Sequence, residues 1–168
     1  MANTYTLIAG TTLGTAAANI DFSSIPSTYT DLLLKVSFRS ATAALYDGLY
    51  IKLNNASTTF TYRAIQGNGA AASSFNGTVG YAGDLNANTS TASTFASAEI
   101  YIPNYTASQN KSMSIDAVGE TNATTIYSHL VASLWSTTTA INQVTVYTQS
   151  GSNLMAYTSA YLYGIKNS

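Results

Sequence analysis

The strongest constraint on the fold is an alternation of apolar and polar residues with a period of two. In the segment DLLLKVSFRS, residues 31–40, one side of an extended chain is wholly apolar: Leu32, Leu34, Val36 and Phe38. The opposite side carries Leu33, Lys35, Ser37 and Arg39. This pattern is typical of a β-strand that buries one face. We therefore expect the first set to form a central core strand.

The same alternation recurs along the chain, in residues 49–54, 95–103, 111–118 and 126–135. In the last of these segments, Ile126, Leu130 and Leu134 share one face, and we assign the face with Tyr127, His129, Val131 and Trp135 to the outside. Four more segments are rich in Thr, Tyr, Val and Ile, which favour strands: 4–10, 59–66, 141–148 and 159–165. Between them, the residues of 67–93 predict a long loop or one that hides a short strand at 77–83. Shorter loops are expected at 105–110 and 119–125.

No window shows the apolar stripe of a helix, and Glu, Lys and Arg are too few to form a solvated helix face. The chain is therefore predicted to be all-β, with about nine or ten strands by the period-two count. Their spacing of roughly eight to twelve residues is that of a sandwich or barrel. We expect a single antiparallel β-sandwich domain over residues 1–168, of jelly-roll or Greek-key type, with a closed barrel as the second choice.

Charge is scarce in this sequence. Only 8% of the residues are charged, against about 25% in an ordinary soluble domain, and the net charge is −1. Little repulsion then opposes association, which suits a protein that works assembled, as a homo-oligomer. The six Lys and Arg residues are scattered, so we expect no nucleic-acid partner. No run approaches the roughly 20 apolar residues of a membrane span, and the first residues do not resemble a signal peptide.

The sequence offers little for catalysis or metal binding. His129 is the sole histidine, there is no cysteine, and no G-x-S-x-G motif is present. The seven carboxylates are dispersed and are interpreted as turn and strand-end residues, with Asp47 before Gly48 as in a hairpin turn. A carboxylate pair for polysaccharide hydrolysis would need a chance approach in the fold. We expect no enzyme activity, no cofactor and no metal ligands; a calcium ion held by carbonyls and one Asp stays open.

Tyrosine is unusually frequent, with thirteen copies. An outward tyrosine offers a rigid contact area and a hydroxyl, as at protein interfaces and sugar sites, although tyrosine is also a good strand former. The candidate interface or ligand contacts are Tyr50, Tyr101, Tyr105, Tyr127, His129, Trp135, Tyr161 and Tyr163.

Three segments together resemble a group of short virion proteins of tailed phages from aquatic bacteria and cyanobacteria. They are FSSIPSTYTDLLLKVSFRS, LVASLWSTTTAINQVTVYT and AYLYGIKNS. The shared pattern is Ile-Pro-x-Thr-Tyr before an alternating strand, then Leu-Trp-x-Ser/Thr with Ala-Ile, and finally Leu-Tyr-Gly-Ile. In the first segment, Pro26 fixes its own φ and separates two strands, and Ile25 and Tyr29 are expected to plug the sandwich edge.

The resemblance implies an antiparallel sandwich and a phage structural role, with no catalytic residues to transfer. Larger relatives carry such a domain at the end of a tail fibre, whereas this chain has the size of the domain alone. A capsid decoration or head-fibre-type protein is therefore expected, made in the host cytoplasm and located on the particle surface. Its partners would be other virion proteins of the capsid or tail. The alternative is a tail-associated adhesin that binds a host-surface glycan through tyrosines and the loop at 67–93.

Overall fold

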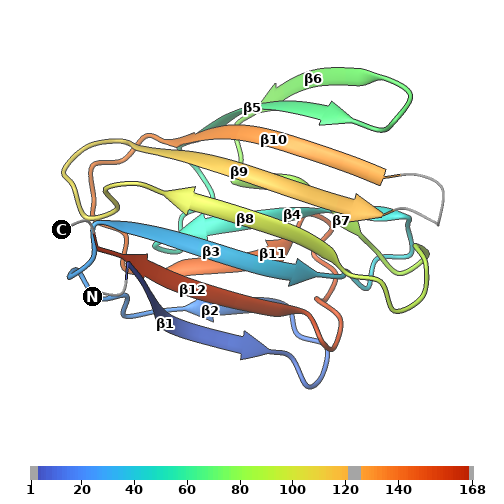
Figure 1. The fold of residues 1–168 in the computed structure, drawn as a ribbon, viewed down its shortest axis with the longest axis horizontal. Helices are drawn as coiled ribbons and strands as arrows, with labels where there is room; N and C mark the ends of the chain where they lie inside the picture. The colour runs from blue at the N-terminus through green and yellow to red at the C-terminus, as the bar shows by residue number, and fades with distance from the viewer. Residues whose placement is uncertain (1–3, 121–125, 167–168) are drawn as a thin grey trace.

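A computed structural model describes residues 4–120 and 126–166. They form twelve antiparallel β-strands and no helix (Figure 1). The strands are β1 (Tyr5–Thr12), β2 (Asn19–Phe22), β3 (Asp31–Phe38), β4 (Tyr46–Leu53), β5 (Phe60–Gly67), β6 (Ala72–Gly77), β7 (Tyr81–Asn86), β8 (Ala96–Ile102), β9 (Lys111–Glu120), β10 (Ile126–Trp135), β11 (Val144–Thr148) and β12 (Ser159–Ile165). No helix in the described part of the chain is long and apolar enough to cross a membrane.

The strands form two sheets, which confirms the predicted β-sandwich. The large sheet has eight strands in the order β1-β12-β3-β8-β9-β10-β5-β6, and the small sheet has four in the order β2-β11-β4-β7. Eight of the strands pair as one long folded hairpin: β1 with β12, β2 with β11, β3 with β8 and β4 with β7. Distributing such a hairpin over two sheets gives the jelly roll. The other four strands, β5, β6, β9 and β10, extend the large sheet on one side.

The core lies between the sheets and explains the alternation in the sequence. One row of paired residues crosses all eight strands of the large sheet on its inner face, and every member is apolar: Ala9, Leu162, Leu34, Ile100, Ile115, Val131, Ala64 and Phe75. Opposite them, the small sheet contributes Leu49, Ile51 and Leu53 of β4, all fully buried. The predicted core set of β3, from Leu32 to Phe38, is buried as expected.

The added strands curl over β7, the edge strand of the small sheet. The ring of Tyr62 on β5 stacks on Tyr81 of β7 with a centroid separation of 4.9 Å, and Phe75 on β6 contacts Tyr81 edge-on at 5.6 Å. His129 of β10 lies 6.1 Å from the same ring. This aromatic cluster covers an edge that would otherwise be open to another strand.

Sequence patterns found most strands but not all of them. The segments predicted at 126–135 and 159–165 coincide with β10 and β12, and the strand suspected at 77–83 corresponds to β7, shifted toward Asn86. Two short strands, β2 and β6, were not predicted. The sequence of β6, ASSFNG, holds few strand-forming residues, and β6 forms because it pairs along β5. The loop at 105–110 is confirmed, whereas residues 121–125 of the loop predicted at 119–125 lie outside the described residues.

Two sequence assignments are wrong. The β10 face with Tyr127, His129, Val131 and Trp135 points into the sandwich, because Val131 pairs with inward Ile115 of β9. Asp47 is not in a hairpin turn: it lies within β4 and is buried, where its carboxylate accepts hydrogen bonds from the hydroxyls of Ser40, Thr42 and Ser150, each at 2.6 Å. These charge-assisted hydrogen bonds replace the solvent that the carboxylate loses on burial.

Each end of the sandwich holds a buried cation that binds loop carbonyls. At one end Arg39 donates from Nη1 to the carbonyls of Thr91 and Thr94, at 2.8 and 2.7 Å, and from Nη2 to those of Asn88 and Ser90. At the other end the Lys111 ammonium donates to the carbonyls of Ala107 and Gln109. Arg39 and Lys111 are almost completely buried. These contacts fix the β7–β8 and β8–β9 loops.

Candidate interaction surface

The outer face of the large sheet, which points away from the small sheet, is the most unusual surface of the molecule. Among the described residues, eleven large apolar side chains are exposed. Eight of them lie on this face: Tyr5, Leu7, Ile65, Tyr101, Val118, Ile126, Leu130 and Tyr161. Single exposed apolar residues are ordinary, but their concentration on one face marks an interaction surface.

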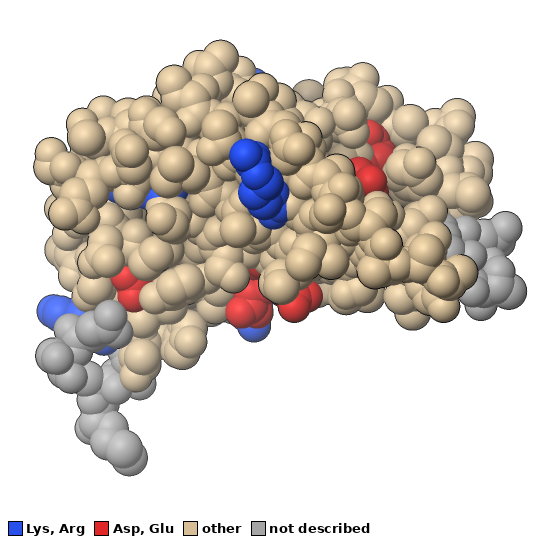
Figure 2. Space-filling model, turned by 90° about the horizontal axis from the view of Figure 1, so that it is seen from above, with Lys and Arg blue, Asp and Glu red and all other residues tan. Residues whose placement is uncertain are grey.

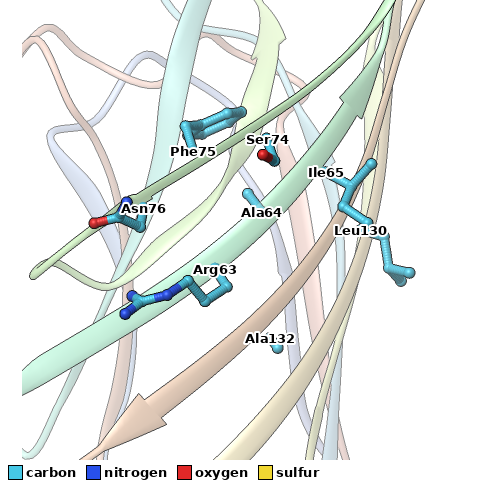
Figure 3. A pocket seen from close by; sticks show the side chains of 8 residues that line it. All are labelled: Arg63, Ala64, Ile65, Ser74, Phe75, Asn76, Leu130 and Ala132. Atoms are coloured by element: carbon cyan, nitrogen blue, oxygen red, sulfur yellow. The ribbon is translucent and has the colours of Figure 1, made fainter.

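Half of these exposed apolar side chains lie on β10, β9 and β5. Leu130 of β10 lies directly opposite Ile65 of β5, and the two side chains are 56% and 57% exposed. They border a shallow hollow of about 310 Å³ whose other walls include Arg63, Ser74 and Asn76 (Figure 3). Because β5 and β10 bring these two side chains together from distant parts of the sequence, the patch exists only in the folded chain.

The row of outward-facing paired residues that includes Leu130 becomes charged near the centre of the sheet. It runs from Leu130 to Asp116 on β9, Glu99 on β8, Lys35 on β3 and Tyr161 on β12. Lys35 Nζ lies 2.9 Å from Glu99 Oε2 in an exposed ion pair, and the Glu99 carboxylate raises the pKa of Lys35. This short charged strip separates the Leu130–Ile65 patch from a second apolar area.

The second apolar area lies on β1, β12, β3 and β8. Leu33 is on the outer face yet is buried, in a row with Tyr163 on one side and Tyr101 on the other. Tyr101 donates a hydrogen bond of 2.8 Å from its hydroxyl to Asp31, which holds its ring in place.

Seen from the side of β6, the molecule is mostly uncharged, with a few isolated charged groups (Figure 2).

Three of the eight residues predicted as contacts lie on the outer face: Tyr101, Tyr161 and Tyr163. Tyr50 and Tyr127 are half-buried instead. The ring of Tyr50 contacts Tyr81 and Tyr147 edge-on, and burial raises its pKa to about 12. Tyr127 contacts Tyr46 edge-on at 5.5 Å. Both side chains therefore pack against other aromatic rings and are only partly exposed to solvent.

The remaining three predicted contacts are wrong, because their side chains are buried in the core. Tyr105 is completely inaccessible, and its hydroxyl donates to the carbonyl of Pro26. Trp135 stacks on Phe60 with a centroid separation of 6.3 Å. His129 is 1% exposed and lies between the rings of Tyr81 and Tyr127. These side chains hold the sandwich together and cannot contact a partner on the surface.

His129 and Asp84 form a close pair of titratable side chains whose pKa values are both shifted. His129 Nε2 lies 3.9 Å from Asp84 Oδ2. Burial lowers the pKa of His129 to about 4 and raises that of Asp84. Burial also raises the pKa of Tyr81, and the Asp84 carboxylate adds to that shift. Solvent does not reach the imidazole, which packs among the rings of Phe75, Tyr81 and Tyr127.

Acidic and histidine side chains are dispersed in the described residues. Nowhere in residues 4–120 and 126–166 do three or more His, Asp or Glu side chains gather as ligands. Asp21, Asp31 and Asp47 accept hydrogen bonds from neighbouring side chains and amides instead.

The key residues missed by sequence reasoning are Ile65, Val118, Ile126 and Leu130. One signal was present: in residues 126–135 both faces of the predicted strand carry large apolar side chains, although a surface strand needs only one apolar face. An apolar second face on a strand of an antiparallel sheet indicates either a second buried layer or a contact surface.

The fold and surface thus define a jelly-roll sandwich with one broad, sparsely charged face. Comparison of the chain with protein-family models, curated proteins and solved structures gives no match.

Proposed function

We propose that this chain is a structural protein of a phage particle, of the capsid decoration or head-fibre type, that binds a virion partner through the outer face of its large sheet. The observation that supports this proposal most is the concentration of exposed apolar side chains on that face, among them the facing pair Leu130 and Ile65. The resemblance of the segments around Pro26, Trp135 and Gly164 to phage virion proteins supplies the virion context.

The size of the face is adequate for a stable protein contact. Eight strands at about 4.8 Å spacing span about 34 Å, and strands of seven or eight residues add about 25 Å in the other direction. The product, about 850 Å², is close to the roughly 800 Å² that each partner contributes to a standard interface. The apolar areas would carry the affinity, and the Lys35–Glu99–Asp116 strip would fix the orientation.

Localisation is the direct test. We expect the chain to be found in purified particles of the phage that encodes it, with labelled copies at regular surface positions in electron micrographs. Absence of the chain from purified particles would overturn the proposal.

A paired variant tests the face itself. The double variant Ile65→Asp/Leu130→Asp should fold, since both side chains are exposed, but should fail to bind particles. Its matched control is Ser57→Asp/Ser108→Asp, which adds the same charge on exposed loops at 54–59 and 103–110. Equal binding by the two variants would show that the outer face is not the contact.

A further inference from the structure

Four loops meet at the end of the sandwich to which β1 and β3 run, the right-hand end in Figure 1: residues 13–18, 39–45, 87–95 and 149–158. Backbone hydrogen bonds join them. Met155 N donates to Arg39 O at 2.8 Å, Asn88 N to Thr42 O at 3.0 Å, and Ala17 N to Leu154 O at 3.0 Å. The loops therefore form one fixed surface instead of four independent segments.

A hollow of about 420 Å³ opens in this surface, between the 87–95 loop and residues 155–157. Its apolar lining includes Phe95, Met155 and Ala156, and its rim carries Asn88 and Ser93, both exposed. A hollow of this size falls within the roughly 300–1,000 Å³ of small-molecule sites.

Tyr157 forms one wall of the hollow and is the most exposed large apolar residue described, at 73%. Its φ is 70°, and that of Ser93 on the opposite wall is 61°. Such left-handed backbone is uncommon for residues other than glycine, and it is a marked exception for a bulky side chain. The conformation is held by hydrogen bonds: Tyr157 N donates to Leu13 O at 2.7 Å, and the buried Thr158 hydroxyl donates to Arg39 O. A conformation that is unfavourable but firmly held is a recognised mark of functional sites.

Arg39 lines the hollow and binds carbonyls of the 87–95 loop. Its guanidinium lies below the 87–95 loop and has both terminal nitrogens occupied by loop carbonyls, those of Asn88 and Thr91 among them. Arg39 is also the sole charged residue among the described residues that line the hollow. Since its terminal donors are used, the hollow presents an aromatic ring, an amide and a hydroxyl, but no available charge.

We propose that this hollow binds a neutral saccharide unit, with the sugar ring stacked on Tyr157 and hydrogen-bonded to Asn88 and Ser93. An aromatic ring packs on the C–H face of a sugar, and amide and hydroxyl groups match its hydroxyls, whereas an anionic ligand would find no free cation. The inference does not depend on the function proposed for the outer face, because different residues at a different part of the molecule carry it.

The test is binding of the whole chain to an array of neutral oligosaccharides built from glucose, galactose, mannose and N-acetylglucosamine, followed by titration of each hit. We expect at least one hit. Tyr157→Gly should weaken its binding at least tenfold while leaving the melting temperature equal or higher, because glycine tolerates the positive φ without strain. Asn88→Ala should weaken binding several-fold.

The matched control is Tyr5→Ala, which removes an exposed tyrosine from the outer face. It should leave saccharide binding unchanged. The proposal is overturned by the absence of any hit at millimolar saccharide, or by a hit whose affinity survives Tyr157→Gly. Particle binding through the outer face should be unaffected by Tyr157→Gly, so the two proposals can fail separately.

Discussion

The ring of Tyr29 lies directly against the backbone of Gly164, where it occupies the space that a Cβ would need. Tyr29 comes from the segment that follows Pro26, and Gly164 is in the last strand, β12. The backbone next to them is also joined, since Thr30 N donates to Ile165 O at 2.8 Å. Two of the three segments that carry the resemblance to phage proteins thus meet in the fold, and glycine at 164 is required by the tyrosine at 29.

Gly164→Ala should therefore destabilise the fold by about 1–3 kcal/mol, the usual cost of overpacking a fitted core. Urea unfolding measures the loss. The variant Tyr29→Ala removes the obstacle, so Gly164→Ala should cost at least about 1 kcal/mol less in the Tyr29→Ala background than in the wild type. Additive effects would mean that the clash with Tyr29 is not the cause.

Burial of His129 predicts a dependence of stability on pH. Its pKa in the folded chain is about 4, below its ordinary value of 6.5. The unfolded chain therefore binds more protons between these values, and the free energy of unfolding should fall as the pH is lowered from about 6.5 to about 4. The shift of the pKa from 6.5 to about 4 corresponds to at most about 3–4 kcal/mol of stability.

His129→Phe should remove this loss. Both imidazole nitrogens are buried with no hydrogen-bond partner among the described residues, and the surrounding rings of Phe75, Tyr81 and Tyr127 suit an aromatic replacement. The variant should gain stability over the wild type as the pH falls from 7 to 4.5, measured by urea unfolding. Asp84, whose raised pKa acts in the opposite direction, is present in both proteins. A pH-independent difference would contradict the prediction.

The alternation of residues predicted the sandwich well because each strand of the jelly roll buries one face. It failed on β10, where both faces are apolar. There the inward face is chosen by pairing with β9 and by the curl of the large sheet over β7, which places His129 beside Asp84. Neither relationship can be read from residues 126–135 alone, because it depends on partners distant in the sequence.

The candidate contacts were predicted less well, for a related reason. Tyrosine content indicates available rings but not their burial, and Tyr105 became a core residue once the carbonyl of Pro26 lay within reach of its hydroxyl. Tyr157, by contrast, was not predicted as a contact. Neither the sequence TSAYLYGI that follows it nor the residues before it indicate a positive φ. Exposed apolar Ile65 and Leu130 become one patch only through the β5–β10 register.

The buried guanidinium of Arg39 should be essential for the end of the sandwich that bears the hollow. Arg39→Lys keeps the charge but loses the planar fork that reaches several carbonyls at once, so it should destabilise the fold by at least about 2 kcal/mol. Amides of residues 88–95 should also exchange hydrogen faster. Arg63→Lys is the matched control: Arg63 is exposed on β5, and its substitution should stay within about 0.5 kcal/mol. Similar losses in the two variants would contradict this role.

Asp47 should be as important to the β3–β4 and β11–β12 loops as Arg39 is to the β7–β8 loop. Its carboxylate accepts from the hydroxyls of Ser40, Thr42 and Ser150, and Asp47→Ala would remove the charged acceptor of the buried Ser40 hydroxyl and of the more accessible Thr42 and Ser150 hydroxyls. We expect a loss of about 2–3 kcal/mol in the free energy of unfolding, measured in urea. Asp116→Ala removes an exposed carboxylate from β9 and should change stability by no more than about 0.5 kcal/mol. If Asp47→Ala were equally mild, the cluster would be an exposed polar contact that water replaces, and the two loops would have to be held by their backbone hydrogen bonds alone.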